Sequence, residues 1–89
     1  MGHAYRVEYR FYDNTAGVMK GVKVLTLHYE LKFLSVAAVE DALAVVVEKN
    51  RDRLTGNSYK VFYDVTVMIE GSNKFEVKWT LPPFEVKHL

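Results

Sequence analysis

The chain has 89 residues, of which 49% are hydrophobic and 26% are charged, and it contains no cysteine. This length suits one domain with a single core, the apolar content excludes a disordered chain, and the missing cysteines exclude disulfide bridges and thiolate metal sites. Twelve basic residues against 11 acidic ones give a net charge of +1, which implies no general affinity for nucleic acid.

The first 33 residues predict two strands joined by a turn. Apolar and polar residues alternate from Tyr5 to Phe11, which is typical of a strand with one buried face. Turn-forming residues follow at 13–17, and a second strand begins near Lys23. Because Val24 is out of phase with the rest of this strand, we expect a β-bulge near Val24 and Leu25. The side chains predicted to face inward are Leu25, Leu27, Tyr29, Leu31 and Phe33.

Residues 35–54 predict one helix. Ser35 is a suitable N-cap residue, and Gly56 with Asn57 provides a stop signal beyond the last helical turn. The valine run at 45–47 has poor helix propensity, so a strand is the alternative there, but the neighbouring alanines favour the helix. The residues predicted to face the core recur at helical spacing: Val36, Val39, Leu43, Val46, Val47, Asn50 and Leu54.

Two further alternating segments, residues 59–70 and 74–81, predict a hairpin. Pairing Ile69 with Phe75 makes residues 71–73 a three-residue loop and places Glu70 opposite Lys74. In this register Val67 faces Val77, and Val65 faces Trp79. A two-residue turn would set Ile69 against Lys74, which the alternation forbids.

Together these elements predict an α+β fold with the order β-β-α-β-β. One helix packs on one face of a mainly antiparallel sheet, and the other face meets solvent. We expect residues 1–81 to form a single domain. Pro82 and Pro83 end the last strand, so residues 82–89 are a C-terminal tail or a short edge strand, either on this sheet or on that of a partner.

The sequence offers little for catalysis. The three histidines lie far apart, and no closed set of metal ligands can be assembled from the sequence. If Phe11 pairs with Leu25, Glu8 falls opposite His28 on the outer face, where such a pair could tune a general base. A cross-strand charge pair is the more common role of two such residues. We therefore expect no enzyme, no cofactor and no metal.

The outer sheet face suggests nucleic-acid binding as an alternative function. Acidic residues interleave with its basic ones, and a face of mixed sign is typical of a solvated surface rather than of a nucleic-acid site. Nucleic acid is therefore the less favoured partner. The candidate residues for this alternative are Arg6, Arg10, Lys32, Lys60, Phe62 and Lys78.

Three features favour contacts with protein instead. A loop places two apolar residues between glycines, where they either meet a partner or fold back under the sheet. The helix has apolar residues off its core-facing stripe, which suggests a second surface, such as another copy of the chain. The third strand carries apolar residues on its outer face, near Tyr12. The candidate contact residues are Val18, Met19, Ala38, Ala42, Val45, Phe62 and Met68.

These patterns predict a small non-catalytic module that acts through protein–protein contacts and self-associates, in the style of accessory or inhibitor proteins of phages and mobile elements. The longest uninterrupted apolar run is Ala42–Val47, much shorter than a membrane span. The N-terminal residues do not resemble a signal peptide. We therefore expect a cytoplasmic protein without a membrane partner.

Overall fold

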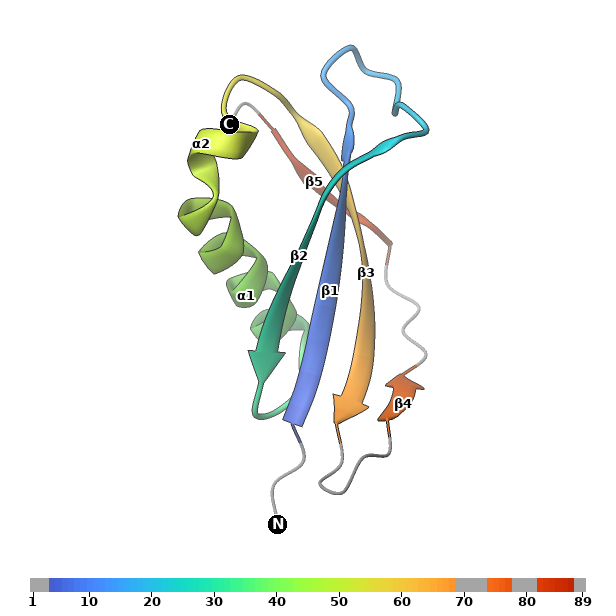
Figure 1. Ribbon diagram of the computed structural model, residues 1–89, viewed down its shortest axis with the longest axis vertical. Helices are drawn as coiled ribbons and strands as arrows, with labels where there is room; N and C mark the ends of the chain where they lie inside the picture. The colour runs from blue at the N-terminus through green and yellow to red at the C-terminus, as the bar shows by residue number, and fades with distance from the viewer. Residues whose placement is uncertain (1–3, 69–73, 78–81, 88–89) are drawn as a thin grey trace.

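An antiparallel sheet and one main helix form the two layers of the computed structural model, which describes residues 4–68, 74–77 and 82–87, with the backbone alone for Met68 and residues 74–77 (Figure 1). The strand order is β2-β1-β3-β4, and β5 pairs with β3. The predicted class, a small α+β fold with an antiparallel sheet and one main helix, is confirmed. The elements are β1 (Ala4–Asp13), β2 (Lys23–Leu31), α1 (Val36–Lys49), α2 (Arg51–Leu54), β3 (Tyr59–Met68), β4 (Lys74–Val77) and β5 (Phe84–Val86).

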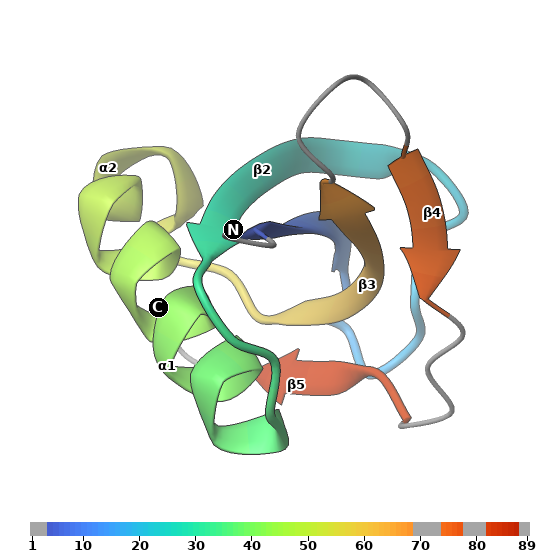
Figure 2. The ribbon, with the colours of Figure 1, turned by 90° about the horizontal axis from the view of Figure 1, so that it is seen from below.

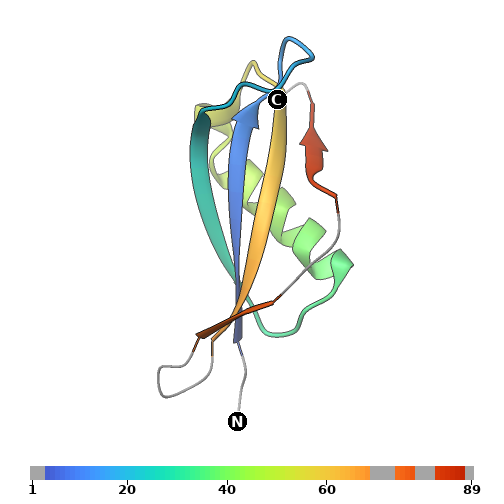
Figure 3. The same ribbon diagram turned by 90° about the vertical axis from the view of Figure 1, so that its right-hand side faces the viewer.

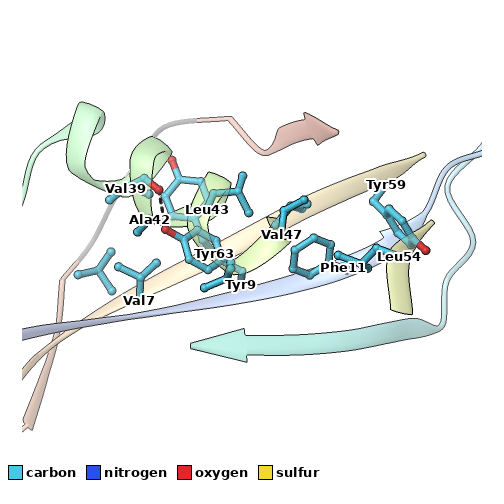
Figure 4. Packing of buried hydrophobic residues seen from close by; sticks show 13 residues of the cluster. Val7, Tyr9, Phe11, Val39, Ala42, Leu43, Val47, Leu54, Tyr59 and Tyr63 are labelled. Atoms are coloured by element: carbon cyan, nitrogen blue, oxygen red, sulfur yellow. Dashed lines mark hydrogen bonds between the residues drawn. The ribbon is translucent and has the colours of Figure 1, made fainter. Parts of the chain in front are cut away.

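The core lies between α1 and the inner face of the curved sheet (Figures 2 and 4). Alternate residues of β1 and β3 point into it, as the period-two pattern requires, and the helix adds a wide apolar face. The buried side chains are Val7, Tyr9, Phe11, Val39, Ala42, Leu43, Val46, Val47, Leu54, Tyr59, Val61, Tyr63 and Val65.

The pairing of β1 with β2 agrees with the sequence pattern. Phe11 pairs with Leu25 and Glu8 with His28, and the register then shifts so that Tyr12 pairs with Lys23. Val24 is thus the extra residue of the predicted bulge. The strand ends two residues before Phe33, whose predicted inward position is wrong, because its side chain is 69% exposed.

The predicted N-cap is confirmed, whereas the single long helix is not. The Ser35 hydroxyl accepts a hydrogen bond from the backbone N–H of Ala38 at 3.0 Å. The helix breaks at Asn50, whose side-chain amide donates to the carbonyl of Val46 at 2.8 Å, and the short α2 follows. Val36, predicted to face the core, is exposed at the start of α1.

The hairpin formed by β3 and β4 has a different register from the predicted one. Val67 pairs with Phe75, and Val65 with Val77, so the pairing is displaced by two residues. A displacement of two keeps every side chain on its own face, and the alternation therefore does not distinguish the two registers. The pairings predicted for Ile69 and Trp79 involve residues outside the described ranges.

The C-terminal tail belongs to this chain's own sheet. In β5, Phe84 pairs with Val61 and Val86 with Tyr59, so β5 lies along the first part of β3 (Figure 3). The ring of Phe84 stacks on that of Tyr63, with the two centroids 5.0 Å apart. Strand pairing and ring stacking together hold the tail against the core.

Tyr9 should make the folded state sensitive to alkaline pH. Its hydroxyl donates to the carbonyl of Val39 at 2.5 Å, and burial, followed by Tyr63 and Tyr29, raises the pKa of Tyr9 well above its ordinary value. The unfolded chain releases this proton near pH 10, about the ordinary tyrosine pKa, whereas the folded chain retains it. Stability is therefore complete below about pH 10 and falls as the pH rises further.

Chemical denaturation at pH 7 and pH 11 measures this effect. We expect Tyr9→Phe to cost about 1 kcal/mol at pH 7, the net value of a hydrogen bond, and to weaken the alkaline loss. An equal alkaline loss in the variant and the unmodified chain would contradict this assignment.

Candidate interaction surface

The large hydrophobic side chains that the structure exposes fall between residues 18 and 45 among the described side chains, but they do not lie together. The loop that carries Val18, Met19 and Val22 lies at the opposite end of the sheet from the β2–α1 connection, and α1 begins at Val36 on the side of β5 (Figures 1 and 3). We call the other three, which lie on β2 or between the end of β2 and α1, the β2-side surface. Its members are Val24, Phe33 and Val45.

β2 is an edge strand of the sheet. It pairs with β1 along its length, and no other described strand lies on its far side (Figure 3). An edge strand presents backbone N–H and C=O groups that can pair with a strand of another chain. The β2-side surface therefore lies beside a row of backbone groups that can pair with another strand.

A mainly apolar groove of about 240 Å³ lies between the end of β2 and α1. Such a groove next to an open strand edge can take alternate side chains of an added strand. Its lining residues are Tyr29, Leu31, Lys32, Phe33, Ala38, Asp41, Ala42 and Val45.

The loop between β1 and β2 has an anchored base and an apolar tip. The backbone N–H of Asn14 donates to the carbonyl of Ser58 at 2.9 Å, and the Ser58 N–H donates to the Thr15 hydroxyl at 3.0 Å. At the tip, the side chain of Val18 is 74% exposed and that of Met19 is 38% exposed. The sequence left open whether Val18 and Met19 are exposed or fold back under the sheet, and the structure shows them exposed.

The predicted helix residues separate into surface and core. Val45 is partly exposed and Ala38 half-buried, and both line the groove. Ala42 is only 2% exposed and belongs to the core, so its predicted place off the core-facing stripe is wrong. The physical reason is its spacing, three residues after Val39 and four before Val46, which puts all three on one face.

The outward residues of β3 are not part of the β2-side surface. The ring of Phe62 is half-buried against Tyr12, with a centroid distance of 5.5 Å and nearly perpendicular planes. The side chain of Met68 lies outside the described part. Val22, Val24, Phe33 and Val36 are additional exposed residues that the sequence pattern did not mark as candidates, although the predicted bulge at Val24 was a usable signal.

The predicted Glu8–His28 pair exists and belongs to a larger charged cluster. His28 Nε2 lies 3.2 Å from Glu8 Oε2, and Arg10 Nη1 lies 3.3 Å from Glu8 Oε1 and also pairs with Asp64. Within the described residues, no group of three or more His, Asp or Glu side chains is placed to hold a metal ion.

One of the basic residues proposed for nucleic-acid binding forms ion pairs within the chain. Arg10 is paired with the carboxylates of Glu8 and Asp64. Arg6 and Lys32 are exposed, and Lys60 is half-buried on β3. Lys78 lies outside the described ranges.

Glu8 should contribute to stability at neutral pH and lose that contribution in acid. Partial burial raises the pKa of Glu8, but hydrogen bonds and charge interactions with His28 and Arg10 outweigh it, so the pKa lies below its ordinary value. The contribution is present above the unfolded-state pKa and is lost as the pH falls through the folded-state pKa. We expect Glu8→Gln to lose less stability than the unmodified chain between pH 6 and pH 3 in urea titrations. Identical losses in both chains would contradict this role.

Comparisons with known proteins give no relative: neither the models of protein families, nor the curated proteins, nor the solved structures yield a match. In the part of the chain that the structure describes, no helix is long and apolar enough to cross a membrane. The β2-side surface and the open edge beside it are therefore the features on which a function can be proposed.

Proposed function

We propose that this protein is a non-catalytic interaction module that binds another polypeptide through the β2-side surface. The observation that carries this proposal is the open edge of β2 together with the adjoining groove, beside which Phe33 and Val45 are exposed. Exposed apolar side chains beside an open strand edge are typical of a contact surface.

The chemistry of this surface fits the addition of a strand. A partner segment in extended conformation can take backbone hydrogen bonds from β2, while alternate side chains enter the groove between β2 and α1. Phe33 lines the groove and is the largest of the exposed hydrophobic side chains that the structure describes. Aromatic residues in this position often provide much of the binding energy.

The test compares two substitutions. Phe33→Asp places a charge at the groove, whereas Ala44→Asp places the same charge on the exposed flank of α1 that faces β5. Each chain is immobilised and exposed to an extract of cells that express it, and light scattering measures self-association in parallel. We expect Phe33→Asp to weaken binding at least about tenfold, equivalent to about 1.4 kcal/mol, and Ala44→Asp to leave it unchanged. Equal binding by all three chains, or no binding and no self-association by any, would overturn the proposal.

The alternative functions predicted from the sequence have less support. The pairing of Arg10 with two carboxylates weakens the case for nucleic acid, and salt-dependent binding of mixed oligonucleotides would restore it. The contact of Glu8 with Arg10 and His28 is that of a surface ion cluster, which needs no catalytic role. The accessory role in phages or mobile elements and the cytoplasmic location stay predictions.

A further inference from the structure

We propose that the partner at the β2 edge is a second copy of this chain, paired antiparallel through β2 about a two-fold axis at Tyr29. This inference rests on the proposed function and specifies its occupant. Its support comes from the open edge and from the charges along β2.

The open edge allows only a few symmetric registers. Directly opposite residues of antiparallel strands share a face, so a two-fold axis must pass through a residue of β2 that then faces its own copy. The regular part of β2 begins at Leu25, beyond the bulge, and ends at Leu31. The axis therefore lies near the middle of this stretch.

The charges on the outer face of β2 distinguish these registers. With the axis at Tyr29, His28 faces the partner's Glu30 and Glu30 faces the partner's His28, so opposite charges meet twice when the imidazole is protonated. With the axis at His28, the two imidazoles face each other. With the axis at Glu30, the two Glu30 carboxylates face each other, and like charges directly opposite each other are unfavourable. An axis at Leu27 would place no opposite charges together and would extend the pairing into the bulge.

The inner face fits the same register. Leu27 then lies opposite the partner's Leu31, and Leu25 and the other inward residues of both strands are already packed against their own cores. Phe33 follows the end of β2 and is largely exposed in the single chain, close to the new strand pair.

This symmetry also places both helices on one face of a continuous sheet. The two-fold axis of an antiparallel strand pair runs through the sheet, so the copies of α1 lie on the same side. Each groove, with Val45 on its helix wall, then adjoins the second copy.

Cysteine pairing tests the register directly, because the chain contains no cysteine of its own. His28→Cys and Glu30→Cys are prepared separately, both on the exposed outer face, and Glu85→Cys on β5 serves as the control. Directly opposite positions have Cα atoms about 4.5–5.5 Å apart, within disulfide range. We expect oxidised mixtures of the first two variants to give mainly mixed disulfide dimers, more than the half that random pairing gives, and the control to stay monomeric.

Each other outcome has a defined meaning. Stronger cross-linking of His28→Cys or Glu30→Cys with itself would overturn this register, and no mixed dimer together with a monomeric mass in light scattering would overturn the second copy as occupant. In the latter case, a different polypeptide that is captured by the unmodified chain and lost with Phe33→Asp would leave the proposed function standing. If the unmodified chain captures no such polypeptide either, both the proposed dimer and the proposed function are overturned.

Discussion

An Ala42→Glu substitution should unfold the protein or leave it only marginally folded. Ala42 is in the core, 2% exposed, between α1 and the sheet. A glutamate there would bury an unpaired charge, at a cost of about 3–5 kcal/mol, which is a large part of the roughly 5–15 kcal/mol that stabilises a domain. Ala44→Glu provides the matched control, because Ala44 is exposed on the same helix and its replacement should change stability by about 0.5 kcal/mol or less.

Circular dichroism and urea titration measure both variants. Loss of the cooperative transition in Ala42→Glu, with the transition of Ala44→Glu retained, is the expected pair of results. If Ala42→Glu instead folded with unchanged stability and only altered self-association, Ala42 would be a contact residue, as the sequence alone suggested, and the observed helix packing would be wrong.

Shortening Leu54 to alanine should cost about 2–5 kcal/mol, the usual effect of removing a large buried aliphatic side chain. Leu54 is completely buried and lies beside Phe11 and Tyr59 at the end of the core nearest α2 (Figure 4). The break at Asn50 brings it there, and the Thr55 hydroxyl, which donates to the Arg51 carbonyl at 2.5 Å, fixes the short turn.

Thermal unfolding gives the size of this effect, with Leu54→Met as the matched control. A loss of 1 kcal/mol lowers the melting temperature of a domain of this size by about 4–8 °C, so Leu54→Ala should lower it by roughly 10 °C or more. Leu54→Met nearly conserves the volume and should cost less than about 1.5 kcal/mol. Equal melting temperatures for the alanine variant and the unmodified chain would show that α2 does not close the core.

The faces of β1 and β2 and the bulge at Val24 could be predicted because both depend on local signals. The alternation fixes which residues face inward, and the phase change at Val24 shows where the extra residue lies. The cap at Ser35 is likewise a local signal. The alternation alone does not fix this register, so Glu8 is placed opposite His28 only once Phe11 is paired with Leu25.

Other features depend on contacts that alternation does not contain. The register of β3 with β4 differs by two residues because both alignments keep the same faces, and the choice between them depends on the loop. The break at Asn50 follows from a side-chain hydrogen bond to Val46 and from the space that Leu54 fills. A continuous helical spacing does not reveal such a break.

The candidate surface was predicted only in part. Val45 was identified, and Val18 and Met19 are exposed as one of the two expectations had it, but the open edge was not identified, because the order of strands in the sheet cannot be obtained from alternation. Phe33 was placed inward because it continues the phase of β2, and only the end of the strand at Leu31 releases it to the surface.

The short strands β4 and β5 set a limit on assembly. They lie along the two ends of β3, at Val65–Met68 and Tyr59–Val61, so the far margin of the sheet is occupied over most of its length, and β2 is its long free margin among the described strands. A sheet with free margins on both sides can add molecules without end and grow into a fibre. Here the margin opposite β2 is made of β4 and β5, which have only four and three residues, and short edge strands offer little for pairing. In the proposed dimer, where the two β2 strands pair with each other, no long free margin among the described strands would be left for a further copy.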